Sequence, residues 1–175
     1  MLNELEKVPF LLSGSNLVTL GIHNLHANKL VVSDSARNSW IKALMEVKAV
    51  LDSLNIKYVL IKYLDVPYVY MQDIDLLIED DRDRDLFFST LRKKGYLSYR
   101  SLFPSHPEKI EFVKPNSPFQ IDVYPEPAWW KISYAPKGLV TQKRILRKFL
   151  ETEVFVPSPT HDIYIIATHG YAHGI

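Results

Sequence analysis

The segment 73–79, with the sequence DIDLLIE, begins by alternating acidic and aliphatic residues. Side chains two positions apart on a β-strand point to the same face. Asp73 and Asp75 therefore share one face of a predicted strand. The aliphatic residues share the opposite face: Ile74, Leu76 and Ile78. One face of this strand is acidic and the other belongs to the core, so the chain must fold around a sheet with two different faces.

A second predicted strand carries a third carboxylate. In the segment 119–124 (FQIDVY), the same spacing turns every second residue toward the core. It leaves Asp122 on the opposite face, together with Gln120 and Tyr124. If the two strands are neighbours in register, three carboxylates converge.

Carboxylates placed side by side repel one another and are poorly solvated, so proteins seldom keep them together without a cation. Mg²⁺ accepts carboxylate oxygens, keeps several waters and completes its shell with substrate phosphates. Two such ions about 3.5 to 4 Å apart can bind the attacking and leaving oxygens of a phosphoryl transfer. Taken alone, Asp73 and Asp75 fit a half-exposed strand in water, but with Asp122 they favour a site for Mg²⁺ or Mn²⁺.

The composition limits the alternatives. A chain of 175 residues, 47% of them hydrophobic, predicts one ordered domain. The absence of cysteine excludes disulfides, thiolate zinc sites, iron-sulfur clusters and a cysteine nucleophile. The net charge of +1 means that any polyanion must meet a local patch. No segment resembles a signal peptide or a membrane span of about 18 apolar residues, so we expect a cytoplasmic protein without membrane contact.

The remaining patterns predict a mixed α+β domain. Apolar residues at spacings of three and four predict a helix over 35–54, and acids followed by basic residues predict another over 81–94. Further strands are predicted at 57–62, 96–101 and 109–114, the last forming an antiparallel hairpin with 119–124. Further helices are predicted at 141–150 and from Pro159 onward, with Ser158 as the N-cap. We therefore expect a mixed β-sheet flanked by helices.

Along the chain, three parts are predicted: an N-terminal extension (1–34), a core (35–130) and a C-terminal helical segment (131–175). The last residues, YAHGI, stop where the helical pattern has barely closed. This leaves open whether the helical segment is compact or truncated.

The run 57–79, KYVLIKYLDVPYVYMQDIDLLIE, resembles the core of the nucleotidyltransferases of the DNA polymerase beta superfamily. In these proteins a strand ends in a Gly-Ser turn, an Asp-x-Asp strand follows roughly ten residues later, and a third acidic residue lies on a later strand. Within the superfamily, the chain is most similar to an uncharacterised nucleotidyltransferase group with a Lys-Gly turn, an Asp-Ile-Asp strand and a His-rich final helix. The matching positions are Lys62, Asp73, Ile74, Asp75, Asp122, His169 and His173, and the resemblance spans about 36–175.

This resemblance implies a nucleotidyltransferase (polymerase beta-like) fold. It also implies Mg²⁺-dependent transfer of a nucleoside monophosphate from NTP to a hydroxyl of a small molecule, RNA or protein, with release of pyrophosphate. Asp73, Asp75 and Asp122 would be catalytic and would hold the metal, and Asp122 could also draw the proton from the attacking hydroxyl. Lys62, Tyr63 and Tyr124 are expected to contact the nucleotide.

The turn before the Asp-Ile-Asp strand departs from the family pattern. Lys62, Tyr63 and Leu64 stand where the superfamily has Gly-Ser, and the Arg that the nearer group carries before Asp-Ile-Asp is missing. A tyrosine side chain here would crowd a closely approaching phosphate. Lys62 is either a phosphate-facing cation or a strand-end lysine in water. The chain is therefore either an enzyme or a degenerate, antitoxin-like binding or regulatory module that keeps the fold.

Three weaker patterns have two interpretations each. His169 and His173 share a helix face and are either near a nucleotide pocket or at a polar helix end, since no third zinc ligand is evident. Trp129 and Trp130 serve either core packing or base stacking. A basic cluster is either a solvated helix face or a site for RNA, a triphosphate or an acidic partner: Lys137, Lys143, Arg144, Arg147 and Lys148. The near-zero net charge disfavours a nucleic-acid binding domain without catalysis.

Overall fold

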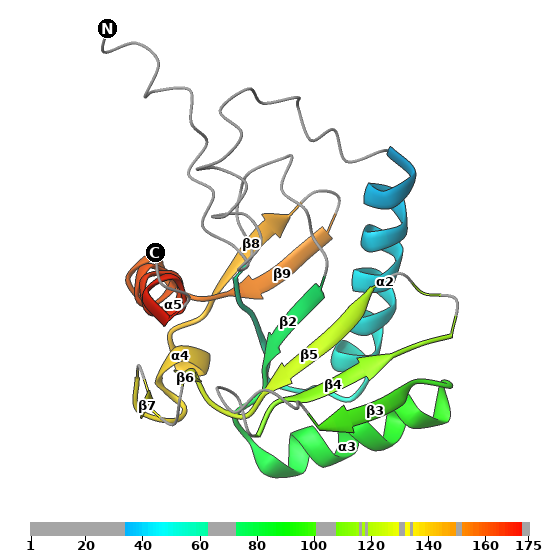
Figure 1. The fold of residues 1–175 in the computed structure, drawn as a ribbon, viewed down its shortest axis with the longest axis horizontal. Helices are drawn as coiled ribbons and strands as arrows, with labels where there is room; N and C mark the ends of the chain where they lie inside the picture. Colours follow the sequence, from blue (N-terminus) through cyan, green and yellow to red (C-terminus); the bar gives the residue numbers. More distant parts are fainter. Residues whose placement is uncertain are drawn as a thin grey trace, which may run out of the picture.

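The computed structural model has an α+β architecture, with a mixed sheet at its centre and helices around it (Figure 1). It describes residues 34–62, 73–100, 108–115, 117, 119–129, 132–133, 135–149 and 152–172. The predictions for the 1–33 segment and for Tyr63, Trp130 and His173 lie outside the described residues, as do those for the side chains of Trp129 and His169.

The central sheet has five strands in the order β1-β2-β5-β4-β3. The strands are β1 (Val59–Leu60), β2 (Asp73–Leu77), β3 (Leu97–Arg100), β4 (Ile110–Val113) and β5 (Gln120–Tyr124). β2 and β5 are parallel, whereas the other neighbouring pairs are antiparallel, so the predicted mixed sheet is confirmed. The predicted hairpin of 109–114 with 119–124 is also confirmed, as β4 and β5.

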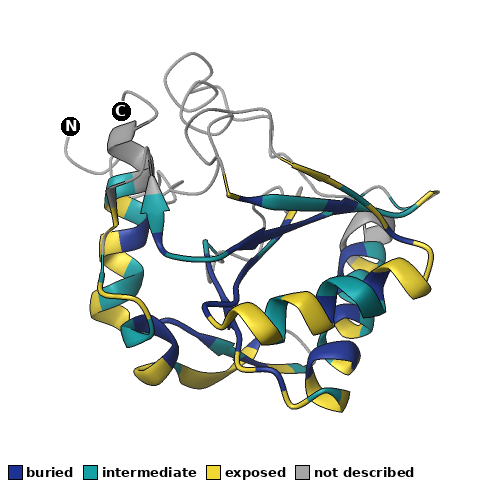
Figure 2. Cartoon of the chain, turned by 90° about the horizontal axis from the view of Figure 1, so that it is seen from below, coloured by how far each residue is buried: buried dark blue, intermediate teal, exposed yellow. Residues whose placement is uncertain are grey.

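The alternation along β2 gives the sheet two differently covered faces. On one face, Ile74 and Leu76 join a core with α2 (Asp34–Ser53) and α3 (Asp81–Lys93). On the other face, Leu77 joins a smaller cluster with Val140 and Ile165. β1, β2 and β5 are mostly buried, the dark blue of Figure 2, whereas β3 and β4 are mostly exposed or half-buried and α2 and α3 alternate between buried and exposed positions. Asp73 and Asp75 alternate with the residues of the first cluster and so lie on the same face as Leu77.

Local signals fix the bounds of α3. The Asp80 side chain accepts a hydrogen bond from the backbone N–H of Asp83 at 3.0 Å, which satisfies a donor at the N-terminus. Acidic residues in the first turn and basic residues in the last turn complement the helix dipole. Gly95 follows with a φ of 86°, a conformation that residues with a Cβ seldom adopt. This helix brings Phe87 and Leu91 into the core.

The predicted basic helix over 141–150 is wrong. The C-terminal part contains strands as well as helices: β6 (Ala128–Trp129), β7 (Ile132–Ser133), α4 (Leu139–Gln142), β8 (Ile145–Phe149), β9 (Thr152–Val156) and α5 (Pro159–Ala172). β8 and β9 form an antiparallel hairpin, because Val154 and Val156 alternate into the core beside Phe149. Pairing with the β-branched strand β9 outweighs the helical spacing that 141–150 shows by itself. The predicted start of the last helix at Pro159 is confirmed.

A buried carboxylate ties this C-terminal part to the end of β2. Glu79 is only 4% exposed, and it accepts hydrogen bonds from the backbone N–H of Gly138 at 2.7 Å and of Thr141 at 3.2 Å. The Thr141 hydroxyl donates to the same carboxylate. These bonds satisfy the buried charge and hold α4 against the sheet.

Among the helices of the described ranges, none has both the length and the apolar character that a membrane span requires.

We predict that Phe112→Ala lowers the free energy of unfolding by about 3 to 5 kcal/mol, because the ring is fully buried. Phe112 lies on β4 with its ring centroid 5.0 Å from that of Phe88. Urea denaturation measures the loss. Leu86→Ala is the matched control, since Leu86 is 45% exposed and its truncation should change stability by about 0.5 kcal/mol or less. Equal losses for both variants would contradict the core assignment.

Candidate functional site

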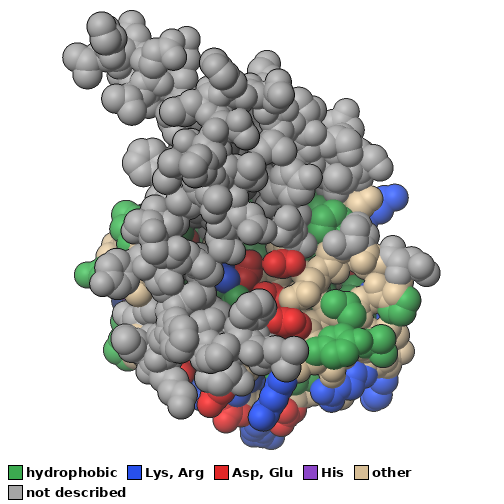
Figure 3. Space-filling view, in the orientation of Figure 1, with side chains coloured by type: hydrophobic (Ala, Val, Ile, Leu, Met, Phe, Trp, Pro, Cys, Tyr) green, Lys and Arg blue, Asp and Glu red, His purple; other side chains and the backbone are tan. Residues whose placement is uncertain are grey.

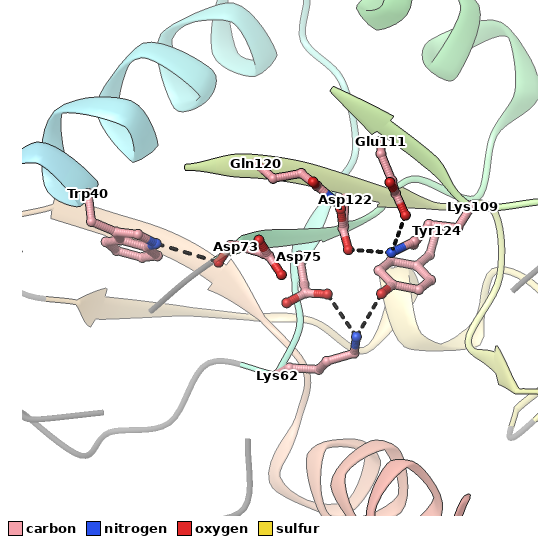
Figure 4. A network of polar contacts seen from close by, with 9 residues as sticks. All are labelled: Trp40, Lys62, Asp73, Asp75, Lys109, Glu111, Gln120, Asp122 and Tyr124. Carbon is pink, nitrogen blue, oxygen red and sulfur yellow. Dashed lines mark hydrogen bonds and ion pairs between the residues drawn. The ribbon is translucent and has the colours of Figure 1, made fainter. Parts of the chain in front are cut away.

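The predicted carboxylates meet where β2 and β5 run side by side. The parallel register pairs Asp75 with Asp122 and Asp73 with Gln120. Figure 4 shows Asp73, Asp75 and Asp122 projecting into one polar network. In Figure 3, acidic side chains gather at the centre of the face that is seen in Figure 1. The two strands are thus neighbours in register, the condition for the three carboxylates to converge.

Lys62 lies between two of the residues expected in the site. Its ammonium donates to Oδ1 of Asp75 at 2.8 Å and to the Tyr124 hydroxyl at 2.7 Å. The Lys62 side chain is only 13% exposed, so its interpretation as a strand-end lysine in water is wrong. Its backbone has a φ of 55°, in the left-handed region that favours glycine. Lys62 follows the end of β1 by two residues.

A second lysine, which the sequence interpretation did not include in the site, holds Asp122. The Lys109 ammonium lies 2.6 Å from Oδ2 of Asp122 and 2.8 Å from Oε1 of Glu111. Gln120 donates to the other Asp122 oxygen, Oδ1, at 2.6 Å. Glu111 could have been found from the hairpin, because the antiparallel register of β4 and β5 places it opposite Asp122.

The crowding of carboxylates changes the protonation of the site. Partial burial of its carboxyl group raises the pKa of Asp73 to about 7, with further contributions from the charges of Asp122 and Asp75. Burial, and then the charge of Asp75, raises the pKa of Asp122 in spite of Lys109. Burial alone would lower the pKa of Lys109, but the charge of Asp122 and its hydrogen bonds outweigh this effect and raise it. Burial, and then the charges of Asp75 and Asp122, raises the pKa of the Tyr124 hydroxyl well above its usual value.

The arrangement of these groups fits a metal ion at two of the three carboxylates. In the described ranges, no group of three or more His, Asp or Glu side chains is placed to hold one ion. Both oxygens of Asp122 already have partners, Lys109 and Gln120. Asp73 is exposed, and within the described part of the chain its carboxylate has no hydrogen-bond or ion-pair partner. Because Mg²⁺ often binds through one or two carboxylates plus phosphates, Asp73 and Asp75 fit it if Lys62 shares or releases Asp75.

The predicted basic cluster does not form one helix face. Lys137 pairs with Asp81 at 3.2 Å, and the Arg144 guanidinium lies 4.4 Å from the ring centroid of Phe155. Arg147 and Lys148 lie on the strand β8 and are exposed. The interpretation of this cluster as a single helical binding surface is therefore wrong.

No protein-family model matches the chain, and no curated protein matches it in sequence. The functional interpretation accordingly depends on the geometry of the site.

We predict that Lys109→Met destabilises the protein by about 3 to 5 kcal/mol, because it leaves a buried Asp122 carboxylate without its cation. Lys109 and Asp122 are 8% and 3% exposed. The double variant Lys109→Met, Asp122→Asn should recover most of this loss, since no buried charge remains. Urea denaturation of the four proteins of this double-mutant cycle measures the coupling.

The matched control for this cycle is Lys48→Met, which breaks the exposed ion pair with Asp52. This pair is worth about 0.5 kcal/mol or less. A Lys109→Met loss no larger than that of Lys48→Met would contradict the account of the buried pair.

The raised pKa of Asp73 predicts a pH-dependent effect of Asp73→Asn. The folded protein holds this proton to a higher pH than the unfolded chain, so the stability that Asp73 contributes falls between about pH 4 and about pH 7. The variant removes this penalty. Its melting temperature should exceed that of the wild type at about pH 8, with a smaller gain at about pH 5.

Melting curves of the wild type and Asp73→Asn at both pH values test this prediction. A carboxyl ¹³C NMR titration of Asp73 reports the pKa directly. A gain that is the same at both pH values, together with an ordinary aspartate titration, would refute it.

Proposed function

We propose that the chain is a Mg²⁺-dependent nucleotidyltransferase of the polymerase beta type, which transfers a nucleoside monophosphate from NTP to a hydroxyl acceptor. The observation that supports this most is the parallel pairing of β2 with β5, which sets Asp75 directly beside Asp122 with Asp73 two residues away. Carboxylates gathered in this way attract a cation, and a bound divalent ion attracts phosphates.

In this proposal the chain's own residues bind and orient the substrate. Bound at Asp73 and Asp75, Mg²⁺ would supply charge neutralisation for the triphosphate. Lys62 would add a second positive charge beside the phosphates, since its ammonium lies at Asp75. Oriented charges of this kind, together with positioning, supply most of the catalysis in phosphoryl transfer.

Asp122 has a narrower role in this proposal than the family resemblance implies. Its residue is only 3% exposed, and both of its oxygens are hydrogen-bonded. An acceptor hydroxyl could reach it only if Lys109 or Gln120 moved. Asp122 therefore positions Lys109, whereas the more accessible Asp73 and Asp75 face the substrate.

A second candidate function is a non-catalytic binding or regulatory module that keeps this fold. It is favoured by the ammonium groups of Lys62 and Lys109, which already balance Asp75 and Asp122 without a metal ion. It is also favoured by Lys62 in a left-handed conformation where a glycine would let phosphate approach the backbone.

We predict that the wild-type protein incorporates label when it is incubated with Mg²⁺ or Mn²⁺, each labelled NTP and a cell extract as the source of acceptor. Asp73→Asn, Asp75→Asn should abolish the incorporation, because the carboxylates that attract the ion are gone. Asp85→Asn is the matched control, since it makes the same chemical change at an exposed position of α3 and should leave the activity intact.

The two candidate functions give different results in this assay. Metal-dependent NTP binding without incorporation would favour the regulatory module. The absence of both binding and incorporation across all four nucleotides would contradict the proposed enzyme.

A further inference from the structure

The surroundings of Asp122 differ from those of the other two carboxylates. Its Oδ2 is bound to Lys109 and its Oδ1 to Gln120, each at 2.6 Å. The Asp122 side chain is 5% exposed and the Lys109 side chain 10% exposed. Both acceptor oxygens are therefore occupied in a site that has little access to water.

Lys109 is held more firmly than a lysine with a single partner. Its ammonium bridges Asp122 on β5 and Glu111 on β4, two residues that are paired in the antiparallel register. Figure 4 shows this ammonium between the two carboxylates, on the side of Asp122 that faces away from Asp73. Moving it would leave two carboxylates without their cation, one of them buried, which is costly.

The other lysine of the network is held differently. Among the described residues, Lys62 binds one carboxylate, Asp75, and a neutral hydroxyl, that of Tyr124. Its release would leave one half-buried carboxylate, which an incoming divalent cation could neutralise. Lys62 can therefore give up its bond to Asp75 and remain beside a bound ion, whereas Lys109 is part of the fold.

The balance of charges in the network also favours one ion at Asp73 and Asp75, with Lys109 fixed at Asp122. Among the described residues, the carboxylates of Asp73, Asp75, Asp122 and Glu111 face the ammonium groups of Lys62 and Lys109. When all four carboxylates are ionised, four negative and two positive charges leave a formal charge that one divalent cation balances. The backbone oxygen of Asp73 accepts a hydrogen bond from Trp40, but its carboxylate has no partner among the described residues, so the ion can enter there.

We propose that Lys109 is a built-in cation, which stands where a second metal ion would bind at Asp122, and that the free chain binds one divalent ion, at Asp73 and Asp75. This inference rests on the proposed function, because it concerns the same carboxylates. Lys109 is a positioning residue here: its fixed charge orients Asp122 and offsets the negative charge of the site. The chain would then load one ion where two-metal enzymes load two.

The test uses Mn²⁺ as the probe, with no nucleotide present. Electron paramagnetic resonance measures the number of ions bound per chain, and thermal melting with and without Mn²⁺ measures their effect on stability. The proteins compared are the wild type, Lys109→Met, the double variant Lys109→Met, Asp122→Asn, and Lys114→Met. Lys114 is the matched control, because it flanks the same strand, β4, and among the described residues pairs with one carboxylate, Glu46, at 2.7 Å.

The wild type should bind one Mn²⁺. Lys109→Met should bind a second Mn²⁺ and should regain with Mn²⁺ much of the melting temperature that it loses, because the ion takes the place of the ammonium at Asp122. The double variant should bind one ion and show no such recovery. Lys114→Met should likewise bind one ion and recover nothing.

Two ions bound to the wild type would overturn the inference, even if Lys109→Met failed to fold. It would also be overturned if Lys109→Met bound one ion and Mn²⁺ left its melting temperature unrestored. If these results appeared while nucleotidyl transfer proceeded, the inference alone would be wrong. If the wild type bound no Mn²⁺ and transferred no nucleotide, the proposed function would fail as well.

Discussion

The repulsion between carboxylates on β2 and β5 is the constraint on which the rest of this site depends. The parallel register puts Asp75 beside Asp122, and the period of the strand brings Asp73 to the same face. Such an arrangement persists if cations offset the charge or if a carboxyl group keeps its proton. Lys62 and Lys109 offset part of it, one from the turn after β1 and the other from the start of β4. We propose that the charge that remains attracts a cation to the site.

The fold supports this arrangement from both faces of the sheet. Ile74 and Leu76 anchor β2 in the core beneath α2 and α3, and Leu77 and Tyr124 anchor the end of the acidic face against α4 and α5. Burial of these apolar side chains supplies the stability that keeps like charges together. These contacts hold the C-terminal end of β2 in place. Asp73, at the N-terminal end of the same strand, stays accessible.

The acidic face was predictable because strand alternation is a local property. The residues DIDLLIE and FQIDVY define it by themselves, and only the adjacency of β2 and β5 had to be assumed. The cations were not predictable in the same way. Lys109 reaches Asp122 across the β4–β5 pair, and Lys62 reaches Asp75 from a backbone in the left-handed conformation. The spacing of residues along the sequence predicts neither contact. The helix predicted over 141–150 failed for a similar reason, since the partner strand β9 decides the conformation of β8.

We propose that these carboxylates form a cation-dependent nucleotide site in which Lys109 stays in place. A crystal structure with Mn²⁺ and a non-hydrolysable NTP analogue, with the anomalous signal of manganese, tests this claim most directly. We expect manganese at Asp73 and Asp75, triphosphate beside Lys62, and the Lys109 ammonium still bound to Asp122. Manganese between Asp75 and Asp122 with Lys109 displaced, or no manganese at these carboxylates, would contradict it.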